Sequence, residues 1–151
     1  MDAMSDHEER ASAETSVTVQ CPCGAVRIEL AGAPLVQFYC HCDDCQIVHG
    51  AAYVPAAMYP ASSVRVVAGE TASWKLKTTE RVTCRACGCR LFAAPAGFGI
   101  RGVVATLLPA GMFRPTFHVQ CQYALVPVKD DLPHYRGFPA RFGGSDEMMP
   151  W

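Results

Sequence analysis

Cysteine placement constrains this chain more than any other feature of its sequence. Seven of its nine cysteines fall into three short clusters. The clusters read Cys21-Pro22-Cys23-Gly24, Cys40-His41-Cys42-Asp43-Asp44-Cys45 and Cys84-Arg85-Ala86-Cys87-Gly88. Thiolates at these spacings are too close for most disulfides but are well placed to share a Zn²⁺ ion. Two clusters offer two ligands each and one offers three, which predicts a closed four-thiolate site and a three-thiolate site with an open position.

Length and composition indicate one globular domain. The chain has 151 residues, of which 50% are hydrophobic and 18% charged, so it can bury a core without help from disulfides. The net charge is −1, which disfavours a nucleic-acid-binding surface of clustered Lys and Arg. No apolar run approaches the roughly 20 residues of a membrane span. We therefore expect neither a nucleic-acid nor a membrane partner.

The first ten residues suggest the compartment. They are rich in acidic residues and contain no apolar stretch, so they do not form a secretory signal. We expect a cytoplasmic protein in a reducing environment, where clustered cysteines are more often metal ligands than disulfides. The odd cysteine count agrees, because nine cysteines cannot all pair within one chain.

Short alternating runs predict a mainly β domain over residues 15–140, with antiparallel sheets and only short helical turns. Residues 1–14 are expected to form a disordered tail and residues 141–151 a loose C-terminal tail. One short helix is expected at 43–49, capped by Asp43 or Asp44 and ended by Gly50. The predicted strands are 17–19, 26–30, 35–39, 51–59, 64–67, 73–77, 81–83, 90–93, 102–106 and 117–123.

The first and third clusters are predicted to pair. Each ends in Cys-Gly, and a glycine at that position permits the left-handed backbone of a zinc knuckle, in which amide N–H groups point at the sulfurs. The ligands Cys21, Cys23, Cys84 and Cys87 would then hold a structural zinc that joins distant parts of the chain.

The second cluster is predicted to be the reactive one. Cys40 and Cys42 leave a strand, and Cys45 falls in the first turn of the short helix, where N–H groups favour a thiolate. Three thiolates leave the metal more electrophilic than four, with a free position for water or a substrate thiol. Alternatively a fourth protein ligand closes this site, and the candidates are His41, His49, Cys89 and Cys121.

Outside the metal ligands, ordinary structural roles are the simplest interpretation. Cys89 and Cys121 are expected to be small buried hydrophobes. His41 lies between two ligands and should point away from the metal. His118 alternates along a strand, which is typical of a structural histidine.

With these clusters placed, the chain resembles the glutathione-dependent formaldehyde-activating enzyme family, also called CENP-V/GFA, over about residues 16–140. The resemblance lies in the three ordered cysteine clusters, in Pro115-Thr116-Phe117-His118 and in the closing segment 132–139. It implies an Mss4-like β fold with two zinc ions. It also implies a structural zinc at Cys21, Cys23, Cys84 and Cys87, and a catalytic zinc at Cys40, Cys42 and Cys45.

The resemblance further implies an activity of the carbon–sulfur lyase type on thiol–aldehyde adducts. The family reaction adds glutathione to formaldehyde to give S-hydroxymethylglutathione. This chain departs from relatives by carrying Gln46-Ile47 where many have basic residues, beside the acidic pair Asp43-Asp44. Two other functions stay open, a non-catalytic zinc-stabilised binding module and a nucleic-acid-binding zinc ribbon.

Overall fold

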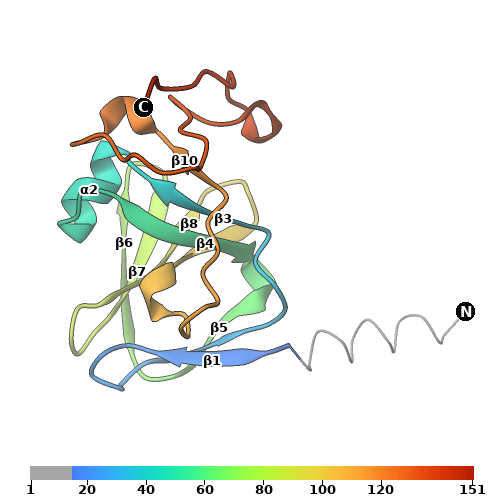
Figure 1. Ribbon diagram of the computed structural model, residues 1–151. Helices are drawn as coiled ribbons and strands as arrows, with labels where there is room; N and C mark the ends of the chain where they lie inside the picture. The colour runs from blue at the N-terminus through green and yellow to red at the C-terminus, as the bar shows by residue number, and fades with distance from the viewer. Residues whose placement is uncertain (1–14) are drawn as a thin grey trace, which may run out of the picture.

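Two β-sheets form the protein in the computed structural model, which describes residues 15–151 (Figure 1). The predicted tail at 1–14 lies outside the described residues. A three-stranded sheet has the order β1-β2-β5, and a seven-stranded sheet has the order β10-β3-β4-β9-β8-β7-β6. The strands are β1 Val17–Gln20, β2 Arg27–Leu30, β3 Val36–Cys40, β4 Val54–Pro60, β5 Val64–Ala68, β6 Thr71–Leu76, β7 Thr79–Cys84, β8 Arg90–Pro95, β9 Ile100–Val104 and β10 Phe117–Val119.

The core lies between the two sheets. Ile28 and Leu30 alternate along β2 and are fully buried, as their spacing predicts. They pack in one cluster with Tyr59 of β4, Leu91 of β8 and Val103 of β9. The predicted mainly β fold class is therefore confirmed.

One strand pair departs from the expected antiparallel arrangement. β10 runs parallel to β3, with His118 opposite Tyr39 and Val119 opposite Cys40. A parallel pair needs a long connection, and here strands β4 to β9 lie between the two strands in the sequence. The predicted strand at 117–123 ends early because Gln120 adopts a left-handed backbone with φ 57°, after which the chain enters a 3₁₀ turn.

The only α-helix among residues 15–151 is α2, Asp43–His49, as predicted. Gly50 ends it in a left-handed conformation with φ 59°. Figure 1 shows α2 at the end of β3 and beside the segment that follows β10. The helix thus starts directly after the strand that carries Cys40. Four 3₁₀ turns, at Ala61–Ser63, Ala105–Leu107, Cys121–Tyr123 and Ala140–Phe142, complete the helical structure of this part of the chain.

The end of the chain contacts the domain, which differs from the loose tail expected from the sequence. Tyr135 forms an antiparallel bridge with Met148, and the Met149 N–H donates to the His134 carbonyl over 2.8 Å. The Trp151 ring packs against His134 with 4.9 Å between ring centroids. These backbone bonds and ring contacts hold residues 147–151 beside β10.

Candidate metal centres and the adjoining pocket

Four thiols from the first and third clusters meet in space. The Sγ atoms of Cys21, Cys23, Cys84 and Cys87 all lie within 4.8 Å of one another. The Cys21 Sγ lies 3.4 Å from that of Cys23 and 3.6 Å from that of Cys84, which is 63 residues away. A tetrahedral zinc with Zn–S bonds of about 2.3 Å needs sulfurs about 3.8 Å apart. This group therefore has the donor chemistry and the spacing to hold such an ion.

Both turns have the backbone of zinc knuckles. Gly24 and Gly88 take left-handed φ angles of 76° and 75°, as expected from the glycine in each cluster. The Val26 N–H donates to the Cys21 Sγ over 3.3 Å, and the Cys87 N–H donates to the Cys84 Sγ over 3.4 Å. The hydrogen bond from Val26 lowers the pKa of Cys21 to about 6. The backbone thus favours the thiolate form that binds metal.

A second group consists of Cys40, Cys42 and Cys45, whose sulfurs also lie within 4.8 Å of one another. The Cys45 and Cys40 Sγ atoms are 3.7 Å apart. Cys40 ends β3, Cys42 is the residue before α2, and Cys45 lies in the first turn of the helix. The strand-to-helix junction is what brings the three thiols together.

Cys42, rather than the predicted Asp43 or Asp44, caps α2. Its Sγ accepts the Cys45 N–H over 3.2 Å. Hydrogen bonds from the Cys40 and Cys45 thiols lower the pKa of Cys42, and the Cys45 N–H and the charge of Arg81 act in the same direction. The carboxylate of Asp44 instead forms an exposed ion pair with Lys77, at 2.8 Å. This places a positive charge beside the acidic pair that the sequence sets next to the thiols.

Within residues 15–151, none of the four candidate ligands joins the three-thiol group. His41 faces away, as expected, and its Nε2 bonds to the Nδ1 of His118 over 2.9 Å. Cys121 is buried in the protein, and Cys89 packs against the core. His49 lines the cavity beside the thiols without belonging to the group. The group that the structure brings together therefore consists of three thiols.

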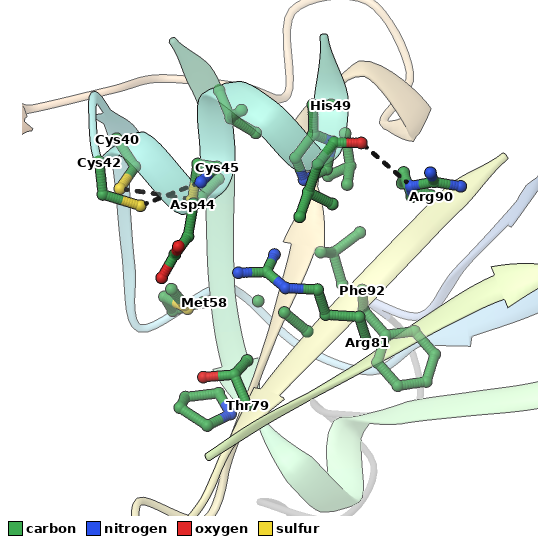
Figure 2. Close-up of a pocket in the computed structure, with 18 of the residues that line it drawn as sticks. Cys40, Cys42, Asp44, Cys45, His49, Met58, Thr79, Arg81, Arg90 and Phe92 are labelled. Atoms are coloured by element: carbon green, nitrogen blue, oxygen red, sulfur yellow. Dashed lines mark hydrogen bonds between the residues drawn. The ribbon is translucent and has the colours of Figure 1, made fainter. Parts of the chain in front are cut away.

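A cavity of about 270 Å³ opens beside these three thiols. Its walls come from β3, α2, β4, β7, β8 and β9. Apolar side chains such as Phe38, Val54 and Phe92 cover much of it. Its lining also contains thiol, polar and charged side chains, which are those of Cys40, Cys42, Cys45, Asp44, His49, Thr79, Arg81 and Arg90. Figure 2 shows the thiols and the helix on one side of this cavity, with β7 and its Arg81 facing them.

Arg81 is the site residue that sequence analysis missed. It lies on β7, is only 8% exposed, and its Nε is buried without a hydrogen-bond partner. Figure 2 shows its guanidinium pointing from β7 into the cavity. A buried N–H group of this kind is rarely left without a partner. No local sequence pattern indicates this role, because a charged residue in a short strand usually faces solvent.

Arg90 connects the two cysteine groups. Its Nε donates to the Val48 carbonyl of α2 over 3.3 Å, and its Nη1 donates to the Gly88 carbonyl over 2.8 Å. One side chain thus joins the helix that carries Cys45 to the knuckle that carries Cys87. The pair of bonds positions helix α2 relative to the four-thiol group.

Comparison with known protein families identifies the family to which the chain belongs. The model of the family called "glutathione-dependent formaldehyde-activating enzyme" (GFA) matches residues 16–123, which include all three cysteine clusters. The chain belongs to the GFA family. The predicted resemblance is therefore confirmed, and two groups of thiols able to hold metal ions are consistent with a family in which zinc is typical.

A solved structure has a similar fold. A crystal structure of a Rhodobacter sphaeroides protein matches with a TM-score of 0.53 and 25% sequence identity, covering 62% of this GFA chain and 89% of that chain. No curated protein matches the sequence. Within residues 15–151, no helix is long and apolar enough to cross a membrane.

Proposed function

We propose that this GFA-family protein binds one Zn²⁺ ion at each cysteine group and catalyses reversible carbon–sulfur bond formation between a thiol and an aldehyde. The preferred reactants are an anionic thiol such as glutathione and a small aldehyde such as formaldehyde. The zinc at Cys21, Cys23, Cys84 and Cys87 is structural. The zinc at Cys40, Cys42 and Cys45 is catalytic.

The observation that carries this proposal is the position of the cavity. A three-thiol group with a free ligand position lies at the wall of a partly apolar cavity, and Arg81 points into it. A purely structural site is normally closed by four protein ligands and needs no adjoining space. The four-thiol group supplies that contrast within the same chain.

The charges in the cavity support an anionic thiol. The acidic pair after Cys42 would repel glutathione, but Asp44 is paired with Lys77. The Arg81 side chain is buried and its Nε has no hydrogen-bond partner, and a guanidinium matches a carboxylate with two parallel hydrogen bonds. Arg81 of β7 would thus supply a positive charge that Gln46 and Ile47, directly after Cys45, do not.

Bound zinc would supply Lewis acidity and a lowered thiol or water pKa at its free position. Side chains of the protein would bind the substrate, exclude water and carry the proton. Arg81 would hold the carboxylate of the thiol substrate, and the apolar wall would exclude water from the aldehyde. Burial, followed by the charges of Arg81 and Arg90, lowers the pKa of His49, so this imidazole stays neutral at physiological pH and is able to accept a proton.

The reaction balances without a redox partner. The thiol sulfur forms a bond to the carbonyl carbon while the carbon–oxygen π bond breaks. The proton lost by the thiol reaches the former carbonyl oxygen, with His49 as the group able to carry it. The reverse sequence releases the aldehyde.

The test compares two cysteine substitutions. Cys42→Ser removes one ligand of the three-thiol group, and Cys89→Ser is the matched control because Cys89 belongs to neither group. We expect Cys42→Ser to lose turnover of glutathione and formaldehyde, measured by NMR exchange, while the metal of the four-thiol group is retained. Cys89→Ser should keep both.

Full turnover in Cys42→Ser would contradict the proposal. If the metal-loaded wild-type protein turned over no thiol–aldehyde pair, the alternative function, a non-catalytic zinc-stabilised binding module, would be favoured instead.

A further inference from the structure

A third group of ligand-type side chains lies on the other face of the seven-stranded sheet from the cavity and its three thiols. It consists of His118 of β10 together with Asp130 and His134 from the segment that follows. One ligand atom of each lies within 4.8 Å of the others. The His118 Nε2 is 2.7 Å from one oxygen of Asp130, and the His134 Nε2 is 2.9 Å from the other. Two imidazoles thus converge on one carboxylate.

The backbone fixes this convergence. His118 and His134 are paired in a parallel bridge, with the His118 N–H donating to the Pro133 carbonyl and the Tyr135 N–H donating to the His118 carbonyl. The Leu132 N–H donates to the Asp130 carboxylate over 3.0 Å and holds it in place. The three side chains are therefore held in position before any ligand binds.

One nitrogen in this group lacks a partner. His134 is 4% exposed, and its Nε2 is buried with no hydrogen bond. The nearby Asp130 oxygen is close enough to contact it, but the geometry is not that of a hydrogen bond. Leaving a buried polar atom unpaired costs about 1–3 kcal/mol. A bound cation would satisfy this nitrogen.

The surroundings supply what a metal-binding imidazole needs. Metal-bound histidines almost always donate their second N–H to another group, which orients the ring. The Nδ1 of His118 lies 2.9 Å from the Nε2 of His41 and provides such a partner. Trp151 packs over His134 and Tyr39 stacks on His118, so the rings are enclosed on several sides. The Asp130 side chain is 33% exposed and leaves a route for an ion from solvent.

The donor set differs in kind from the two thiol groups. Imidazole and carboxylate suit first-row divalent ions such as Mn²⁺, Fe²⁺, Co²⁺ and Zn²⁺, whereas thiolates select zinc and other soft ions. An octahedral ion with bonds of about 2.1 Å needs neighbouring ligand atoms about 3.0 Å apart. The two nitrogen–oxygen distances, 2.7 and 2.9 Å, are close to that spacing.

We propose that His118, Asp130 and His134 form a third metal site, for a first-row divalent ion whose remaining positions are filled by water. The ion would bind the segment after β10 to β10 itself. Because His118 bonds to His41, the ion would also help to hold His41 in position between Cys40 and Cys42. This site rests on its own residues and stands whether or not the three-thiol group is catalytic.

The test uses Mn²⁺, which thiolates bind poorly and nitrogen–oxygen sites accept. The full chain is first dialysed against a weak chelator that leaves thiolate-bound zinc in place. It is then titrated with Mn²⁺ while free Mn²⁺ is followed by electron paramagnetic resonance. We expect one bound Mn²⁺ per chain in the wild type, and none in Asp130→Asn or His134→Gln.

Asp131→Asn is the matched control, since it makes the same chemical change at the neighbouring, exposed position. It should bind one Mn²⁺ like the wild type. Failure of the wild-type chain to bind Mn²⁺, or equal binding by the Asp130 and Asp131 variants, would overturn the proposal and leave the group as a hydrogen-bonded clamp. The wild-type titration decides even where a variant does not fold.

Discussion

Replacing Arg81 by methionine should separate recognition of the proposed thiol substrate from the stability of the fold. The side chain is 8% exposed, points into the cavity, and has a buried Nε without a partner. A hydrogen bond to a charged group contributes about 1.5–3 kcal/mol. Because about 1.4 kcal/mol corresponds to a tenfold change, Arg81→Met should lower kcat/KM for glutathione roughly 10- to 150-fold.

The same variant should fold as well as the wild type or better. Methionine fills a similar volume and removes the desolvation cost of a guanidinium whose Nε has no hydrogen-bond partner. The free energy of unfolding, measured by urea denaturation of the zinc-loaded protein, should stay within about 1 kcal/mol of the wild-type value or increase.

A thiol without carboxylates, such as 2-mercaptoethanol, provides the decisive comparison. Its kcat/KM should change little in Arg81→Met, because there is no carboxylate for Arg81 to hold. Arg65→Met is the matched control, since it removes one positive charge from an exposed ion pair on the other sheet. An equal loss for both thiols, or no loss for glutathione, would refute the role given to Arg81.

Three further substitutions test the structural argument. Cys84→Ser should lower the melting temperature and release one zinc, because a ligand of the four-thiol group is lost. Thermal unfolding combined with metal analysis measures both effects, and an unchanged melting temperature would contradict the prediction. Tyr59→Phe removes a fully buried hydroxyl without a partner, so it should raise the free energy of unfolding by about 1 kcal/mol, while Tyr123→Phe, at an exposed ring, should not. Gly69→Ala should destabilise by at least about 2 kcal/mol, because φ is 86° and a Cβ would clash with the Ala25 carbonyl; denaturation with no loss would show that this turn tolerates a side chain.

The cysteine groups could be predicted from sequence because their geometry is mostly local. A Cys-Gly knuckle fixes its own turn, so Gly24 and Gly88 indicate both halves of the four-thiol group, although the two halves lie far apart in the sequence. Helix α2 and its end at Gly50 could be predicted from the same kind of short-range chemistry. The family resemblance rested on these segments, and the family match confirms it.

The remaining features depend on how distant strands pack. Arg81 enters the cavity because β7 lies opposite α2 across that cavity, and no local sequence pattern indicates this arrangement. The convergence of His118, Asp130 and His134 needs a bridge between β10 and a segment without regular structure. From sequence alone Asp44 is expected to repel an anionic thiol, but in the structure it forms an ion pair with Lys77, which is 33 residues away.

The most direct test of the central claim measures the metal environment of the three-thiol group. Zinc-loaded protein would be examined by X-ray absorption at the zinc edge before and after the addition of glutathione, with Cys42→Ser alongside. The account predicts that the average number of sulfur neighbours per zinc ion rises when the thiol is added to the wild type, because its sulfur occupies the open position. No change in sulfur coordination would contradict an open, substrate-binding zinc site.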